Sequence, residues 1–277
     1  MNPPFFIPVT HLAGIGNTIK GFISALAISD DVKIRCNRDT VLGNFDRILE
    51  PQFIIQDETD IQGRDIFSSC RFLVLKEEEE YQRDLPNEYS SYTTIDLSSD
   101  NKYRHLFSQK VMIDWYYDRK LIHDKVFERI QNGIKKIVWK TEIIEEVNRT
   151  VASITFPALG VSVRTWNGHH PGDRGCTRQY NKEAYLHEMS QIVDTHPTNT
   201  IFMSYDNSEY SHEYADFLKN HQVVSYTPSD EFDLLQIAIV KILILAKCDY
   251  FVCNRQSTYA ELVFWFNGCE QIVRTVF

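Results

Sequence analysis

The sequence predicts an α/β protein in which parallel strands alternate with helices that cover them, and three observations support this fold class. Apolar runs such as 158–163 and 250–253 contain almost no polar residues, which is typical of strands buried on both faces. Longer segments with helical spacing separate these runs along the C-terminal half. The chain has 277 residues and a hydrophobic content of 43%, enough for one large or two modest domains, each with its own core.

The N-terminal half opens with an expected strand over 5–9 and an expected helix over 18–28. Between them lies Gly14-Ile15-Gly16-Asn17, which is either a turn that brings the backbone close to a ligand or simply a tight connection. In chain order, the other elements expected in this half are strands over 53–55 and 72–75, a loop over 81–101 and a largely helical segment over 108–143.

The C-terminal half alternates strand and helix more regularly, which favours a parallel sheet covered on both faces. In chain order, we expect a strand over 158–163, a helix over 182–193, a strand over 200–204, helices over 210–220 and 230–246, a strand over 250–253 and a helix over 257–266. The domain boundary is expected at residue 150, which gives α/β domains over 1–150 and 151–277.

The segment 250–266 is a candidate anion site because a buried strand ends there in a polar turn that opens a helix. Ser257 or Thr258 is expected to cap this helix, and Thr258 has Glu261 at the spacing of a capping box. The first N–H groups of a helix lack intrahelical partners and lie at the positive end of its dipole, so they favour phosphate. The alternative is an ordinary strand–helix junction that binds nothing.

Two further residues follow predicted strands of the same half. Arg164 comes directly after the strand 158–163, where its guanidinium could hold a diphosphate through several fixed donors. Asp206 follows the strand 200–204 and could accept hydrogen bonds from a nucleobase or ribose, or could instead cap the next helix or form an Asx turn. Because ligands of open α/β sheets collect at the carboxyl ends of the strands, these residues and the Ser257-Thr258 turn could share one crevice.

The composition excludes several classes of protein. A net charge of −9 argues against general electrostatic binding of nucleic acid. The proline-broken start resembles no signal peptide, and no apolar run reaches the length of a membrane span, so we expect a cytoplasmic protein. The six cysteines show no zinc-binding spacing, and no Asp-x-Asp triplet of the metal-dependent type occurs, so we expect no metal.

Four pieces of the sequence, in the right order, resemble the GT-B fucosyltransferases that use nucleotide sugars, including the nodulation and protein O-fucosyltransferase branches. Residues 14–17 look like the Gly-x-Gly-Asn turn of that family, and Val161-Ser162-Val163-Arg164 looks like its His-x-Arg strand. Residues 201–207 look like its strand ending in an acidic residue near the nucleotide. Residues 248–265 look like its closing segment, in which a Ser/Thr-rich turn binds phosphate.

The resemblance implies a GT-B-like fold of two Rossmann-like parallel-sheet domains facing a cleft, with the acceptor on the side of domain 1–150 and the nucleotide sugar in domain 151–277. It implies an inverting, metal-independent transfer of fucose from GDP-fucose to a glycan hydroxyl, in which Arg164 stabilises the leaving diphosphate. The implied donor-binding residues are Gly14, Gly16, Asn17, Arg164, Asp206, Ser257 and Thr258. Candidates for the base are His169 and Asp173, with His170, His11 and Asp114 as further choices.

Departures from the family pattern keep other functions open. Ser162 stands where the family commonly has histidine, and Thr165-Trp166 replaces the basic residue or glycine that often follows the arginine. Another donor such as UDP-xylose is therefore an alternative, as is a nucleotide- or glycan-binding module without catalysis. A dinucleotide oxidoreductase is excluded because Gly14 and Gly16 are not followed by the third glycine and the acidic residue of that fingerprint.

Overall fold

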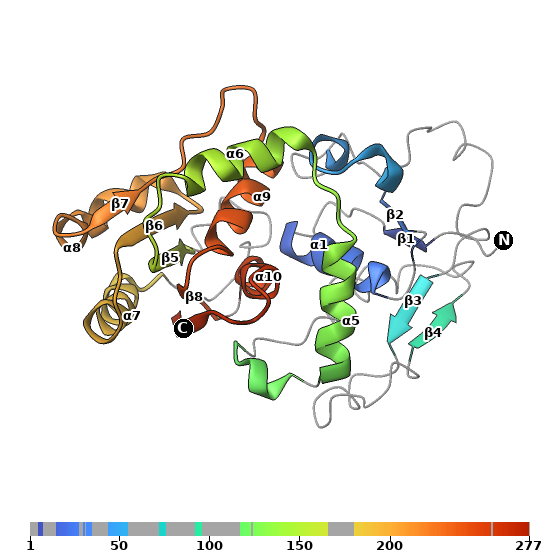
Figure 1. Cartoon of the computed structure of the whole chain (residues 1–277), viewed down its shortest axis with the longest axis horizontal. Helices are drawn as coiled ribbons and strands as arrows, with labels where there is room; N and C mark the ends of the chain where they lie inside the picture. The colour runs from blue at the N-terminus through green and yellow to red at the C-terminus, as the bar shows by residue number, and fades with distance from the viewer. Residues whose placement is uncertain are drawn as a thin grey trace. The chain divides into compact units, whose positions relative to one another are not determined.

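The computed structural model, drawn in Figure 1, describes residues 5–7, 15–27, 30, 32–34, 44–54, 72–75, 92–95, 117–122, 124–165, 180–255 and 257–276. The chain divides into two compact units, Met1–Lys140 and Thr141–Phe277. Helix α6 (Thr141–Val151) packs on α9 (Leu234–Leu245), which is why it belongs to the second unit. The predicted boundary at residue 150 lies at the end of α6, and the observed division lies at its start.

The first unit contains short strands and two long helices. In chain order, its described elements are β1 (Phe5–Ile7), α1 (Ile15–Leu26), β2 (Val32–Ile34), η1 (Phe45–Arg47), η2 (Pro51–Phe53), β3 (Phe72–Leu75), β4 (Tyr92–Ile95), η4 (Arg119–Leu121) and α5 (Asp124–Lys135). Strands β1 and β2 pair in parallel, whereas β3 and β4 pair antiparallel. Helix α1 packs closely on α5, because a Cβ atom on Gly133 would lie 2.6 Å from the carbonyl oxygen of Ile23.

The strand predicted over 53–55 is wrong. Residues 51–53 form a 3-10 turn that begins with Pro51, whose fixed φ and missing N–H suit the first position of a helical turn. Of the two described residues in the segment 53–55, Ile54 makes a β-bridge, to Ile34. The loop predicted over 81–101 is also incorrect in part, since it contains β4, whose tyrosine and threonines favour extended backbone.

The helical segment predicted over 108–143 is interrupted in the structure. Helix α5 ends at Lys135, and α6 begins at Thr141. Between them, Trp139 forms an antiparallel bridge with Leu49, so the chain is extended there. The interruption separates the helix of the first unit from the helix that opens the second.

The second unit is a parallel α/β unit. In chain order, after α6, its elements are β5 (Ala158–Val163), α7 (Lys182–Thr195), β6 (Thr200–Tyr205), η6 (Ser208–Tyr214), α8 (Ala215–Leu218), β7 (Gln222–Val224), α9, β8 (Tyr250–Asn254), α10 (Thr258–Phe266) and β9 (Ile272–Val276). The five strands are all parallel and lie in the order β7-β6-β5-β8-β9. Strand β5 is central and buried along its whole length, as its apolar sequence predicts.

Helices cover both faces of this sheet (Figure 1). On the face of α7, apolar side chains of alternate strand positions form one core cluster with the helix: Leu159, Val161, Val163, Tyr185, Met189, Ile192, Ile201, Met203, Tyr214, Tyr250, Val252 and Val276. On the other face, α9 lies close to β5, because a Cβ atom on Gly160 would lie 2.9 Å from Leu245 Cδ2. Helix α9 is apolar nearly all round, since it packs between β5, α6 and α10.

The predicted helix over 210–220 is mostly a 3-10 helix, η6, followed by the single turn α8. Helix α9 begins four residues later than predicted, because Asp233 and Gln236 form a complete capping box. Strands β2, β7 and β9 were not predicted from the sequence. Among the described helices, none is long and apolar enough to cross a membrane.

Candidate functional site

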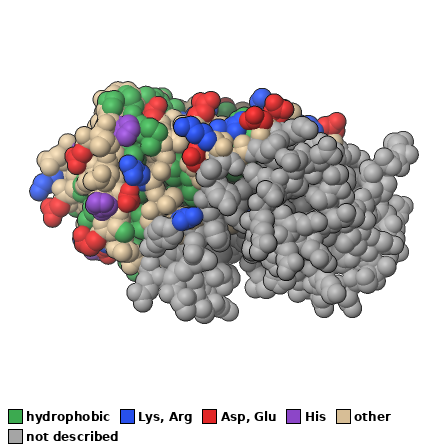
Figure 2. Space-filling model, turned by 90° about the horizontal axis from the view of Figure 1, so that it is seen from below, with side chains coloured by type: hydrophobic (Ala, Val, Ile, Leu, Met, Phe, Trp, Pro, Cys, Tyr) green, Lys and Arg blue, Asp and Glu red, His purple; other side chains and the backbone are tan. Residues whose placement is uncertain are grey.

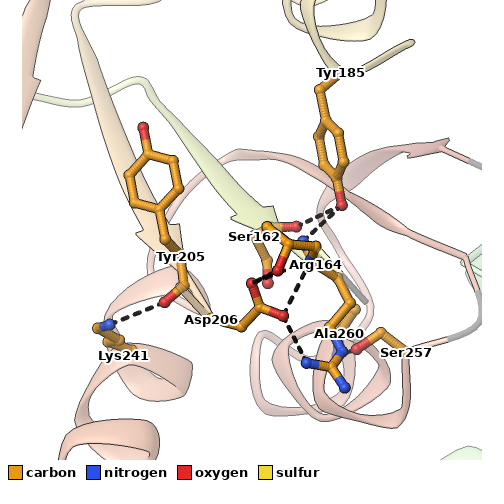
Figure 3. A network of polar contacts seen from close by, with 9 residues as sticks. Ser162, Arg164, Tyr185, Tyr205, Asp206, Lys241, Ser257 and Ala260 are labelled. Atoms are coloured by element: carbon orange, nitrogen blue, oxygen red, sulfur yellow. Dashed lines mark hydrogen bonds and ion pairs between the residues drawn. The ribbon is translucent and has the colours of Figure 1, made fainter. Parts of the chain in front are cut away.

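The candidate site lies at the carboxyl edge of the five-stranded sheet, where the strand order changes direction. The chain leaves β5 toward α7 on one face and leaves β8 into α10 on the other, so the connections diverge between these neighbouring strands. Such a switch point is the usual place for a ligand in an open α/β sheet. Three predicted site residues follow strands at this edge: Arg164 after β5, Asp206 after β6 and Ser257 after β8 (Figure 3).

The carboxylate of Asp206 joins the ends of β5 and β6. Its Oδ2 atom lies 2.6 Å from Nη1 of Arg164 in an ion pair whose two side chains are 19% and 22% exposed. The main-chain N–H of Thr165 donates to both carboxylate oxygens at 3.1 Å, and the Thr165 hydroxyl donates to Oδ1 at 3.0 Å. Asp206 therefore does not cap the following helical segment, which Asn207 caps.

The phenol of Tyr185 also holds this segment, from the face of the sheet that α7 covers. Tyr185 belongs to α7 and is buried. Its hydroxyl accepts a hydrogen bond from the N–H of Arg164 at 3.0 Å and donates one to the carbonyl of Ser162 at 3.2 Å. Two main-chain groups at the end of β5 are thereby paired by one side chain. Burial raises the pKa of the phenol, so it stays protonated and can act as a donor.

Ser257 is the N-cap of α10, which answers the choice that the sequence left open. Its hydroxyl oxygen accepts a hydrogen bond from the N–H of Ala260 at 3.4 Å, and Thr258 is the first helical residue. In Figure 3 the guanidinium of Arg164 points toward Ser257, consistent with the pairing of β5 and β8. A cationic side chain and the positive end of a helix dipole therefore meet at one edge.

Lys241 also lies at this edge, although the sequence did not predict it as a site residue. It lies on α9, and its Nζ atom donates to the carbonyl of Tyr205 at 3.3 Å, directly before Asp206 (Figure 3). Burial lowers its pKa, and the negative charge of Asp206 opposes that shift. The available signal was a single lysine inside the run 234–246, in which Gln236 is the only other polar residue. Tyr185 offered no comparable signal.

The other predicted site residues either lie outside the described residues or belong to the first unit. Gly14, His169 and Asp173 lie outside the described residues, as do the further base candidates His11, Asp114 and His170. Helix α1 begins at Ile15, so Gly16 and Asn17 lie in its first turn, within the first unit. Their roles as donor-binding residues stay predictions.

The described residues contain no group of three or more metal-binding side chains. On the face shown in Figure 2, Lys and Arg side chains are interspersed with Asp and Glu, and no large basic patch gathers among the side chains that are drawn in colour. Phosphate binding on this face would therefore depend on a local site rather than on a general basic surface.

The strand order and its switch point define a Rossmann-like parallel unit, and comparison with known proteins shows which fold the chain resembles. No protein-family model matches the chain, and no curated protein matches its sequence. The solved structure of POFUT1 without ligand matches over 99% of this chain and 98% of that one, at 14% identity and a TM-score of 0.53. NodZ alpha-1,6-fucosyltransferase soaked with GDP-fucose matches over 96% and 93%, at 11% identity and a TM-score of 0.51.

POFUT1 in complex with GDP-fucose matches over a shorter stretch, 55% of this chain and 49% of that one, at 20% identity and a TM-score of 0.39. At such identities the likeness to the full-length matches is one of fold. The chain has the GT-B fold of the fucosyltransferases, which confirms the fold class predicted from its sequence.

Proposed function

We propose that this protein is a glycosyltransferase that transfers a sugar from a nucleotide diphosphate donor to a glycan hydroxyl, with fucose from GDP-fucose as the favoured donor. The observation that carries the proposal is the meeting of Arg164 with the N-terminus of α10 at the switch point of the sheet. The choice of donor is supported by NodZ, a structure of the same fold that was soaked with GDP-fucose.

In the proposed reaction, the acceptor oxygen bonds to the anomeric carbon as the bond from that carbon to the diphosphate breaks. Attack from the face opposite the diphosphate inverts the configuration of the sugar. Negative charge grows on the leaving diphosphate, where the Arg164 guanidinium and the first N–H groups of α10 stabilise it without a metal ion. The hydroxyl proton passes to a base, for which His169 and Asp173 are our candidates.

The donor can be tested by the thermal stability of the purified protein with GDP, GDP-fucose, UDP, UDP-xylose and NAD, each with and without EDTA. A ligand at about 100 times its Kd stabilises the folded state by about 2.7 kcal/mol. We expect GDP and GDP-fucose to raise the Tm equally well in EDTA. A response to uridine nucleotides alone would move the donor to UDP-xylose or a related sugar, and no response to any nucleotide would refute the donor site.

Catalysis is tested by Arg164→Ala. If Arg164 stabilises the leaving diphosphate, turnover should fall by about 10²-fold or more, because an electrostatic contact made in the transition state is lost. Arg274→Ala is the matched control, since Arg274 is an exposed arginine in the middle of β9 in the same sheet. Binding of GDP-fucose by the wild type without transfer to any glycan would instead support the non-catalytic binding module.

A further inference from the structure

We propose that Asp206 and Tyr185 are positioning residues that fix the orientation of Arg164 before a ligand arrives, and that Asp206 acts on a ligand through Arg164. This inference rests on the proposed function in one respect, because the ligand that Arg164 receives is taken to be a diphosphate. It assigns Asp206 a task that differs from direct recognition of a nucleobase or ribose. The task also includes Tyr185, which no sequence pattern singled out.

The hydrogen bonds of Asp206 are directed at the end of β5. An ionised carboxylate offers about four acceptor positions. In the structure its two oxygens receive the Thr165 N–H, the Thr165 hydroxyl and the Arg164 guanidinium, with the N–H shared between both oxygens. Thr165 is 4% exposed, so this part of the network is shielded from water. The main chain adds to it, because the N–H of Asp206 donates to the carbonyl of Val163 at 3.2 Å.

Tyr185 fixes the backbone of the same arginine. Its hydroxyl hydrogen-bonds to the carbonyl of Ser162 and to the N–H of Arg164 at the end of β5. The residue is 1% exposed and belongs to the core on the α7 face. The direction of the Cα–Cβ bond of Arg164 is thereby set from α7, while the end of its side chain is set from β6. The two constraints come from different elements of the unit.

A guanidinium is a planar fork, so a carboxylate that holds one of its nitrogens restricts the directions in which the plane can face. A side chain held in this way has already lost much of its rotamer freedom, so less entropy is lost when a ligand binds. The ion pair also places a negative charge near the expected diphosphate. Asp206 should therefore help binding through orientation and oppose it through repulsion, and these two effects can be separated.

A double-mutant cycle separates the orienting effect of Asp206 from its repulsion. The variants are Asp206→Asn, Arg164→Ala and the double variant, and calorimetry measures their binding of GDP. In the presence of Arg164, we expect Asp206→Asn to raise the Kd by about tenfold or more, because a charge-assisted contact that orients the arginine is lost. In the Arg164→Ala background, the same change should leave the Kd unchanged or lower it, since only repulsion remains to be removed. Equal weakening in both backgrounds would show that Asp206 contacts the ligand itself and would overturn the proposal.

A second measurement needs no ligand. The Nε–H resonance of Arg164 in the folded protein reports how ordered its guanidinium is, and we expect a slowly exchanging signal that broadens in Asp206→Asn and in Tyr185→Phe. Asp216→Asn is the control, because the Asp216 side chain is fully exposed and lies 3.5 Å from Lys219 in a surface ion pair. An Arg164 signal unaltered by both changes would overturn the positioning role. If the wild type binds no nucleotide, the proposed function fails, and this spectrum alone decides the positioning role.

Discussion

Lys241 carries a charge that its surroundings oppose. Burial lowers its pKa, and the opposing attraction of Asp206 does not cancel that effect. The unfolded chain therefore binds more protons than the folded chain between the lowered pKa and the ordinary value of 10.5, and stability rises with pH across this interval. Replacing the ammonium by an apolar group of similar length removes the penalty that burial imposes on the charged form.

We expect Lys241→Met to raise the Tm at neutral pH and to lose this advantage as the pH approaches 10.5. The measurement is thermal unfolding of both proteins over that pH range. Lys219→Met should change little, because Lys219 is exposed on the surface of the same unit. A variant that is less stable than the wild type by the same amount at every pH would show that the hydrogen bond to Tyr205, rather than the charge, dominates.

A site residue could be predicted where its position in the chain, directly after a strand, indicates its place in the fold. It could not be predicted where its role depends on how distant elements pack. Arg164, Asp206 and Ser257 each follow a predicted strand, so their positions in the chain were enough to predict that they lie at one edge of the sheet. Their pairing was not predictable, because the sequence does not state that β5 and β6 are neighbours. Tyr185 is separated from Arg164 by 21 residues, and its role depends on how α7 lies on the sheet.

At the scale of elements, the contact between α1 and α5 depends on one glycine. A Cβ atom on Gly133 would lie 2.6 Å from the carbonyl oxygen of Ile23 and 3.0 Å from the backbone nitrogen of Ala27. These are backbone atoms, so neither can move aside without shifting α1. In an exposed helix, Gly→Ala would stabilise by up to about 1 kcal/mol, whereas overpacking of a tight contact costs about 1–3 kcal/mol.

We therefore expect Gly133→Ala to destabilise the first unit, against the intrinsic preference of the helix. Denaturant unfolding followed by far-UV circular dichroism measures the effect. Asn132→Ala is a suitable comparison, because Asn132 lies in the same helix and is exposed, so the change should be neutral or stabilising. If both variants gained stability, the close packing of α1 on α5 would be refuted.

Strands with a continuous apolar sequence were predictable, whereas strands with exposed residues were not. Strand β5 was predicted with its observed bounds, because six consecutive buried residues leave an unambiguous apolar run. Strands β7 and β9 lie at the edges of the sheet and contain exposed residues, so their sequences lack that signal. Residues 51–53 combine apolar character with Pro51, and the local geometry of proline outweighed the pattern.

At the scale of the molecule, the second unit contains a connected group of tyrosines, of which Tyr185 and Tyr214 are buried and Tyr180 and Tyr205 are partly buried. Tyr180, Tyr185, Tyr205 and Tyr214 come from α7, the residues before it, β6 and η6, with ring centroids 5.9 to 6.5 Å apart where they meet. Burial raises the pKa of each phenol above the ordinary value of 10.0, and that of Tyr205 to about 12. A raised pKa favours folding below pH 10, and this contribution is lost as the pH rises through the folded value.

We expect the second unit to unfold cooperatively as the pH rises from 10 to about 12, together with ionisation of these tyrosines. Tyrosinate absorbance and far-UV circular dichroism should change in one coincident transition. Tyr214→Phe should move that transition to higher pH, since one buried phenol no longer ionises. Gradual ionisation near pH 10 with unchanged circular dichroism would instead show that these side chains are accessible to solvent.

The strand order has a consequence for the folding of the chain while the ribosome is still synthesising it. Strand β5 pairs with β6 on one side and with β8 on the other, and β8 is synthesised after β6, β7 and α9. Until β8 emerges, the backbone N–H and C=O groups on that side of the apolar strand β5 have no partner strand. Such an open edge can pair with another chain and cause aggregation. Pairing that is distant in sequence also forms slowly. The nascent chain should therefore depend on protection by chaperones until the residues that build the Ser257 turn have left the ribosomal tunnel.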